Sequence, residues 1–168
     1  MAVGAAAVFV VALALHTLIV DEEKRHILER KEQAARILAT SMRLPFTQIL
    51  LYEETGLVAE AGLLDLYISR MVGNKEMRVS YAMVLDPEGV VLSHSDLTQF
   101  HKRLDDPLSR RALAATDLVL SYAGDPFQGG VIDVAAPLNV SSKRFGTLRL
   151  GYSLSGLAEE VRGLKRKV

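Results

Sequence analysis

The first twenty residues form an unbroken apolar segment. From Met1 to Val20 no side chain is charged, whereas ten of the next sixteen residues, 21–36, are charged. Twenty helical residues rise about 30 Å, the thickness of the hydrocarbon core of a bilayer. We therefore predict a transmembrane helix, a signal anchor, over 1–20. Two alternatives stay open: a cleavable signal peptide with a small-residue site at Ala12-Leu13-Ala14, and a buried helix of a globular core.

Helical periodicity continues over 21–43. The apolar positions on one face of this segment are Ile27, Ala34, Leu38 and Met42. Such a narrow stripe fits either a seam between two helices or a helix that lies along a sheet. Pro45 has no backbone N–H and is predicted to end the helix. Shorter helices are predicted over 46–54 and 57–71.

The second half of the chain changes to alternating patterns that predict strands. Two hairpins are expected, one around the turn Asp86-Pro87-Glu88-Gly89 and one around 141–144. The predicted strands are 79–85, 90–95, 118–122, 131–140 and 145–154, with a short helix over 107–115 and a final helix over 156–168. Because short turns join most of the strands, the sheet is predicted to be antiparallel, which gives an α+β fold with one domain over 21–155.

Composition and charge exclude several classes of function. The chain has 20 Lys and Arg against 20 Asp and Glu, so it lacks the basic excess of a nucleic-acid-binding protein. It has no Cys, and its four histidines are scattered along the sequence. His94, Asp96 and His101 lie near one another in sequence, but their spacing is not that of a typical metal site. No phosphate-binding loop or nucleophile motif is present. We predict no catalysis in this chain, no metal and no cofactor.

Three segments together resemble a known family. They are 81–96 (YAMVLDPEGVVLSHSD), 131–138 (VIDVAAPL) and 146–153 (GTLRLGYS). In their order and spacing, downstream of an apolar segment, they resemble the extracytoplasmic single Cache, or periplasmic PAS-like, sensor domain of bacterial transmembrane receptors. The resemblance implies a five-stranded antiparallel sheet, a long N-terminal helix packed on one face, a preceding transmembrane helix, and a ligand pocket on the other face.

The resemblance also implies candidate ligand-binding residues. In the citrate-sensing branch of the family, His94 takes the place of a ligand-contacting histidine, whereas basic residues of that branch correspond here to Val91, Asp133 and Ala135. Because a desolvated tricarboxylate needs compensating cations, we expect a neutral or zwitterionic ligand. The candidate ligand-binding residues are His94, Asp133, Arg149, Tyr81, Tyr122 and Lys102.

Each candidate also has a structural interpretation. Asp133 and Arg149 could pair across neighbouring strands, as opposite charges on one face do. Tyr81 and Tyr122 could be packing residues, His94 an ordinary strand residue, and Lys102 a solvated loop charge. The residue pattern alone leaves these alternatives open.

The expected function is a ligand-sensing input domain of a membrane-bound receptor. We expect a two-component sensor histidine kinase whose catalytic domain is absent from this chain, in the bacterial inner membrane with the sensor domain periplasmic. The alternatives are a chemoreceptor or cyclic-dinucleotide enzyme, a ligand-free dimerisation scaffold, and a secreted binding protein. A homodimer is predicted along 21–42, with Ile27 and Leu38 in its interface. Residues 156–168 are expected to lead toward a second membrane span.

Overall fold

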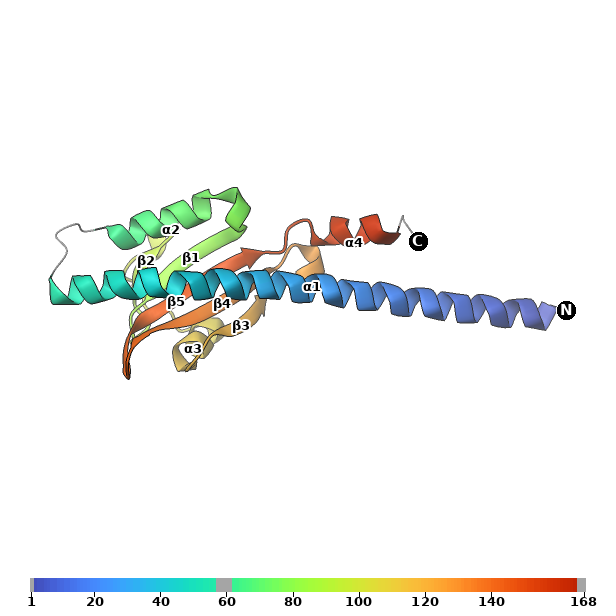
Figure 1. Ribbon diagram of the computed structural model, residues 1–168, viewed down its shortest axis with the longest axis horizontal. Coiled ribbons are helices and arrows are strands. Elements are labelled where there is room, and N and C mark those ends of the chain that lie inside the picture. The colour runs from blue at the N-terminus through green and yellow to red at the C-terminus, as the bar shows by residue number, and fades with distance from the viewer. Residues whose placement is uncertain (1, 57–61, 166–168) are drawn as a thin grey trace.

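The computed structural model describes residues 2–56 and 62–165, and the side chains of 15, 18, 19, 21–56 and 62–163. Four helices and five strands form the fold (Figure 1). The helices are α1 (Ala2–Thr55), α2 (Leu63–Gly73), α3 (Pro107–Ala114) and α4 (Leu157–Lys165). The strands are β1 (Val79–Leu85), β2 (Val91–His94), β3 (Val119–Ala123), β4 (Val131–Val140) and β5 (Lys143–Ser153). Three short 3₁₀ turns are η1 (Lys75–Met77), η2 (Leu97–Gln99) and η3 (Pro126–Gln128).

The five strands form one antiparallel sheet in the order β2-β1-β5-β4-β3. The predicted α+β class and the antiparallel sheet are therefore confirmed. Strand β4 has the predicted bounds, and the two hairpins β1–β2 and β4–β5 form around the predicted turns. Ser141 takes a left-handed conformation in the second turn (φ 54°), which lets the chain reverse within two residues.

Helices α1 and α2 cover one face of the sheet and enclose the main apolar core (Figure 1). Alternate residues of each strand point to this face. The largest fully buried side chains include Phe46 of α1, Ile68 of α2, Ile132 of β4, and Leu148 and Leu150 of β5. Each apolar side chain of this size contributes about 1.5–3 kcal/mol when it leaves water. This face therefore supplies most of the apolar burial that holds the sheet and the two helices together.

Pro45 does not end α1, which is a correction to the sequence prediction. The helix continues through Pro45 to Thr55. Proline removes the bond to the carbonyl four residues earlier, that of Ser41, but Ser41 is exposed and water can reach it. The following turn is held by burial, because Phe46 is fully buried. The hydroxyl of Thr47 also donates to the carbonyl of Arg43 at 2.7 Å.

The apolar stripe of α1 faces the sheet. Ile27 is 1% exposed, and Ala34, Leu38 and Met42 pack against the main core. The sequence allowed either a seam between two helices or a helix that lies along a sheet, and the second arrangement is observed. Ile27 is therefore covered within one chain and cannot form part of the expected dimer interface, whereas Leu38, its expected partner there, is partly buried against the core.

The apolar N-terminal segment forms the first part of α1, which projects beyond the sheet (Figure 1). The predicted anchor over 1–20 falls mostly on residues whose side chains lie outside the described ones. Among the residues that the structure does describe, no helix is long and apolar enough to cross a membrane.

Helix α4 packs beside α1 and ends on the same side of the sheet as the N-terminus (Figure 1). Leu157 and Val161 of α4 are buried in the main core. Lys31 of α1 forms an ion pair with Glu160 at 2.9 Å. The last helix of the chain is thereby fastened to the first.

Candidate ligand-binding site

The second face of the sheet carries the polar residues that the sequence singled out. His94 of β2 and Arg149 of β5 are both register partners of Met83 in β1, so the three lie in one row. In the next row, Asp133 of β4 pairs with Gly151 of β5, which pairs with Tyr81 of β1. The rows are neighbours, since residues two apart in a strand point to the same face.

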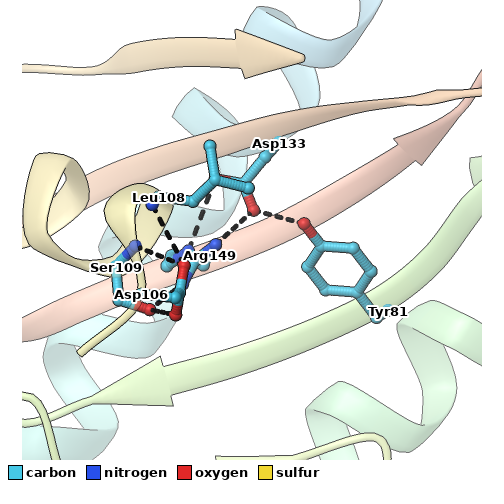
Figure 2. A network of polar contacts seen from close by, with 6 residues as sticks. All are labelled: Tyr81, Asp106, Leu108, Ser109, Asp133 and Arg149. Carbon is cyan, nitrogen blue, oxygen red and sulfur yellow. Dashed lines mark hydrogen bonds and ion pairs between the residues drawn. The ribbon is translucent and has the colours of Figure 1, made fainter. Parts of the chain in front are cut away.

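Asp133 and Arg149 form a buried ion pair at the centre of this face (Figure 2). Nη2 of Arg149 donates to Oδ2 of Asp133 at 2.8 Å, and Nε donates to Oδ1 at 3.4 Å. The Arg149 and Asp133 side chains are 4% and 3% exposed. The structural interpretation of these two candidates, a pair across strands, is therefore observed. Charges this deeply buried are maintained only when their partners compensate for lost hydration.

The third donor of Arg149 connects the pair to α3. Nη1 of Arg149 donates to Oγ of Ser109 at 2.6 Å, and Ser109 is fully buried. The Ser109 hydroxyl donates in turn to the carboxylate of Asp106. Asp106 caps α3, because its Oδ1 accepts from the backbone N–H groups of Leu108 and Ser109, both at 3.0 Å. Helix α3 is therefore held over the face by the same guanidinium that binds Asp133.

Tyr81 completes the network from β1. Its hydroxyl donates to Oδ2 of Asp133 (Figure 2). The tyrosine ring lies over Gly151, where a Cβ would collide with ring carbons. Glycine at this position of β5 is therefore what lets Tyr81 reach across to β4.

The electrostatics of the network oppose the loss of its charges. Burial alone would lower the pKa of Arg149, but the hydrogen bonds and charge of Asp133 outweigh it and raise that pKa. Burial raises the pKa of Tyr81, and the neighbouring charge of Asp133 raises it further. Burial also acts to raise the pKa of Asp106, but the hydrogen bonds from Ser109 reverse the effect and lower it. Arg149 and Asp106 are therefore charged at neutral pH, and Tyr81 stays a hydrogen-bond donor.

His94 lies on the same face, one strand further along. Its Nδ1 accepts from the backbone N–H of Asp96 at 2.7 Å. Burial lowers the pKa of His94, as does the charge of Arg149, against the opposing effect of Asp96. The imidazole is thus neutral at pH 7, and the charge that acts on it from the network is that of Arg149.

The structure places the other two candidates elsewhere. Tyr122 of β3 is 41% exposed and points to the opposite face, where its hydroxyl donates to Glu32 of α1. Lys102 is exposed in the segment after η2, and its backbone carbonyl accepts from the N–H of Val91 at 2.9 Å. Of the six candidates, Tyr81, Asp133 and Arg149 are joined directly, with His94 beside them.

Sequence reasoning missed the residues that α3 contributes. The sequence predicted a helix over 107–115, and α3 begins at Pro107 as predicted. No local pattern, however, places Ser109 against Arg149, forty residues later. Arg144 is a second such residue, since it donates to the carbonyls of Leu113 and, at 2.8 Å, Ala115. It therefore caps the end of α3 while Asp106 caps its beginning.

Among the described residues, two buried side-chain atoms near α3 have no hydrogen-bond partner: Nε of Arg144 and Oγ1 of Thr147. Thr147 of β5 is fully buried, two residues before Arg149, and its hydroxyl forms no hydrogen bond within the described part of the chain. Its register partners are Leu85 and Pro137. An unpaired buried hydroxyl costs about 1–3 kcal/mol. The face beneath α3 therefore contains a buried hydroxyl whose hydrogen-bonding capacity is not used in this structure.

A sheet with a long helix on one face and a buried polar cluster under a small helix on the other defines this chain as an α+β domain. The sensor domain of DcuS from E. coli shares this fold: it is 17% identical, with a TM-score of 0.55 over 83% of this chain and 97% of that one. The sensor domain of the V. cholerae histidine kinase DctB is 15% identical, with a TM-score of 0.51 over 86% of this chain and 59% of that one. No curated protein is similar enough in sequence to count as a relative.

The family model described as single Cache domain 3 matches residues 22–166. Because the match spans most of the 168 residues, the chain belongs to the single Cache domain 3 family. It is accordingly a sensor domain, the ligand-sensing input module of a signal-transduction receptor.

Proposed function

We propose that this chain is the extracytoplasmic input domain of a membrane-anchored sensor histidine kinase, and that it binds its ligand beneath α3. The observation that carries the proposal is the Asp133–Arg149 pair, which occupies the face of the sheet opposite α1. In this structure the pair is closed over by α3. A ligand would therefore enter by separating Asp133 from Arg149 and by moving α3.

The charges beneath α3 favour a zwitterionic ligand. Two carboxylates, those of Asp106 and Asp133, lie close to the single guanidinium of Arg149. A ligand carboxylate can replace Asp133 on Arg149, and a ligand ammonium can then neutralise Asp133. A tricarboxylate would add three negative charges beside Arg149, while Arg144, the other described cation that contacts α3, already donates to the carbonyls of Leu113 and Ala115, so most of the added charge would be desolvated without compensation. An amino acid is the simplest compound with the required pair of charges.

Ligand binding would reach the membrane through the two helices that leave the domain. Arg149 and Asp133 belong to β5 and β4, and β5 leads through Ser153 into α4. Since α4 is paired with α1 through Lys31 and Glu160, a shift of β5 moves one helix against the other. The energy for this shift is the difference between the ligand's affinities for the two arrangements.

Thermal unfolding of the full chain in nonionic micelles tests the ligand class. Binding raises the midpoint by mass action. We expect members of a panel of zwitterionic amino acids to raise it, and citrate to have no effect at matched ionic strength. A midpoint raised by citrate and by none of the amino acids contradicts the proposal.

Two tyrosines provide a matched pair of variants for the site. Tyr81→Phe removes the hydroxyl that orients Asp133, and Tyr122→Phe removes an equivalent hydroxyl, bonded to Glu32, on the opposite face. We expect Tyr81→Phe to weaken ligand binding about tenfold, the effect of one lost hydrogen bond to a charged group. Tyr122→Phe should leave the affinity unchanged. Equal losses in both variants would place the site elsewhere.

We also propose that the domain is a homodimer through the outward stripe of α1. This stripe consists of Arg30, Gln33, Ile37, Thr40 and Leu44, which alternate at spacings of three and four residues. Ile37 and Leu44 are 60% and 65% exposed although both are large and apolar. A seam with this spacing is what two helices need to pack along their length.

Light scattering of the full chain in micelles measures the oligomeric state. Ile37→Glu combined with Leu44→Glu should give a monomer. The control is Leu66→Glu, which alters an apolar residue of α2 with 43% exposure away from the stripe. A dimer that survives the double substitution would exclude this surface.

The anchor over 1–20 remains part of the proposal. It is supported by the apolar sequence and by the projection of α1 beyond the sheet (Figure 1). We expect the full chain to remain in the membrane fraction after alkaline carbonate extraction, whereas a chain that begins at Asp21 is released. Release of the full chain would exclude the anchor.

A further inference from the structure

A hollow of about 390 Å³ lies at the junction between the start of β1 and the end of β5, away from the face beneath α3. The turn after α2, the first residues of β1, and the segment between β5 and α4 surround it. Its lining residues are Val72, Asn74, Lys75, Arg78, Val79, Ser80, Ser153 and Ser155. None of the eight is acidic, and two carry a positive charge.

Neither charged residue of this hollow forms an ion pair within the described part of the chain. Lys75 and Arg78 are both exposed, and neither forms one of the ion pairs there. The remaining charges of α4 near its start are satisfied elsewhere, since Glu159 pairs with Arg162 and Glu160 with Lys31. The residues that line the hollow therefore carry two positive charges and no negative one, with Glu76 of η1 as the neighbouring acidic residue.

The polar groups of the lining add hydrogen-bond donors. The amide oxygen of Asn74 accepts from the N–H of Glu76, which leaves its NH₂ group for another acceptor. Ser153 donates its hydroxyl hydrogen to Ser155, whose own hydroxyl hydrogen remains available. Donors from several directions around one space match the oxygens of a tetrahedral oxyanion.

The backbone at Arg78 is held in a conformation that arginine rarely adopts. Its φ is 55°, in the left-handed region, where glycine or asparagine has less strain. Two hydrogen bonds fix this residue: its N–H donates to Lys75 at 3.3 Å, and its carbonyl accepts from Ser153 at 2.7 Å. These two contacts hold the strained backbone at Arg78, which is one of the residues that line the hollow.

We propose that this hollow binds a soluble phosphate- or sulfate-type oxyanion. The anion would contact Lys75 and Arg78 on one side and Ser155 on the other. It would thereby connect the turn before β1 to the junction at which α4 begins. This site is separate from the one beneath α3, so the two proposals can fail independently.

A lipid headgroup is too far away to occupy the hollow, if the anchor ends near residue 20 as proposed above. Lys31 lies eleven residues further along α1, which is about 16 Å at 1.5 Å per residue. Glu160 pairs with Lys31, and α4 runs toward the N-terminal end of α1 (Figure 1). Ser155, at the hollow, therefore lies farther from the membrane than Glu160 does. The geometry selects an anion dissolved in water.

Inorganic phosphate is the probe for the first experiment. Binding to the full chain in nonionic micelles is measured by ³¹P line broadening, and the thermal midpoint is compared in phosphate and in chloride at equal ionic strength. We expect a higher midpoint in phosphate and saturable broadening. An equal midpoint in both salts, with no broadening, overturns the proposal.

Charge-neutral variants then locate the binding. Lys75→Gln combined with Arg78→Gln should weaken phosphate binding at least about tenfold, since each charge-assisted hydrogen bond contributes this much or more. Arg70→Gln is the matched control, because Arg70 is an exposed cation of α2 outside the lining. An equal loss in the control would show general electrostatic attraction and would overturn the site.

Vesicles separate the two sources of phosphate. The chain is reconstituted in vesicles of phosphatidylcholine, with or without a third of phosphatidylglycerol, and phosphate binding is measured again. We expect the same affinity in both. If the anionic lipid abolishes binding of free phosphate, the hollow takes a headgroup, and the assignment to a soluble anion is wrong.

Discussion

The two faces of the sheet are built from the same strands but by opposite chemistry. Toward α1, strands β4 and β5 present Ile132, Leu148 and Leu150, all fully buried and apolar. Toward α3, the alternate residues of the same strands are Asp133 and Arg149, which are buried and charged. One face gains free energy from apolar packing throughout, whereas the other combines a small apolar cluster (Met83, Leu85 and Val91) with charges that are stable only with particular partners in place.

This difference indicates which face can respond to a ligand. Apolar packing is non-directional. Beneath α1 and α2 there are therefore few specific contacts that a small molecule could replace with contacts of its own. Beneath α3, each charge is satisfied by a specific atom, and a ligand that offers the same atoms can exchange with it. We therefore propose that the apolar face keeps the domain folded and that the polar face is the one that rearranges when a ligand binds. The four predictions below test this division.

The largest effect is expected from an apolar deletion. Phe46 is fully buried, and Phe46→Ala should lower the free energy of unfolding by about 3–5 kcal/mol, from lost burial and the cavity left behind. Equilibrium urea denaturation measures the change. The matched control is Tyr52→Ala, six residues later on α1 with 41% exposure, which should cost much less. Similar losses would show that α1 is not a core element at Phe46.

A comparable loss is expected when one buried charge loses its partner. Asp133→Ala leaves Arg149 buried and unpaired, and should cost about 3–5 kcal/mol in the same assay. Replacing both residues, as Asp133→Leu with Arg149→Met, should recover most of this loss while abolishing ligand binding. A double variant as unstable as the single one would show that the pair itself stabilises the fold.

The cap of α3 should have a smaller effect. Asp106→Ala removes the acceptor for the N–H groups of Leu108 and Ser109, and should cost about 1 kcal/mol. Asp105→Ala, at a neighbouring carboxylate that is 80% exposed, is the control. Hydrogen exchange of the amides of α3 should increase in the first variant only. Unchanged exchange in Asp106→Ala would show that α3 is held without its cap.

The smallest effect is expected from the pH dependence of His94. Its pKa in the folded chain lies below the ordinary 6.5, so the unfolded chain binds more protons between the two values. The free energy of unfolding should therefore decrease as the pH falls below 6.5, and reach its full value above it. The difference between the wild type and His94→Gln, measured from pH 7.5 to 5, isolates this residue. Parallel curves would show that His94 is not shielded by burial.

Some of this architecture was predictable because it depends on short-range pattern. The alternation along 131–140 predicted β4 with its observed bounds, and Pro and Gly indicated the turn of the first hairpin. Alternation also placed Asp133 and Arg149 on one face, which made their pairing one of two open interpretations. The helix predicted over 107–115 likewise begins where α3 begins, at Pro107. Each of these inferences relies on neighbours within a few residues.

Only the tertiary structure decided what covers each element. The stripe of α1 fitted a partner helix as well as a sheet, and only packing assigns Ile27 to the sheet. Pro45 was predicted to end a helix, but α1 continues through it because the next turn is buried against the core. Tyr81 and Tyr122 were both predicted to lie in strands, but Tyr81 donates to Asp133 on one face of the sheet and Tyr122 donates to Glu32 on the other. Residue type and spacing determine which way a side chain points, whereas the groups that meet it come from distant parts of the chain, so their contacts are set by the free energy of the whole fold.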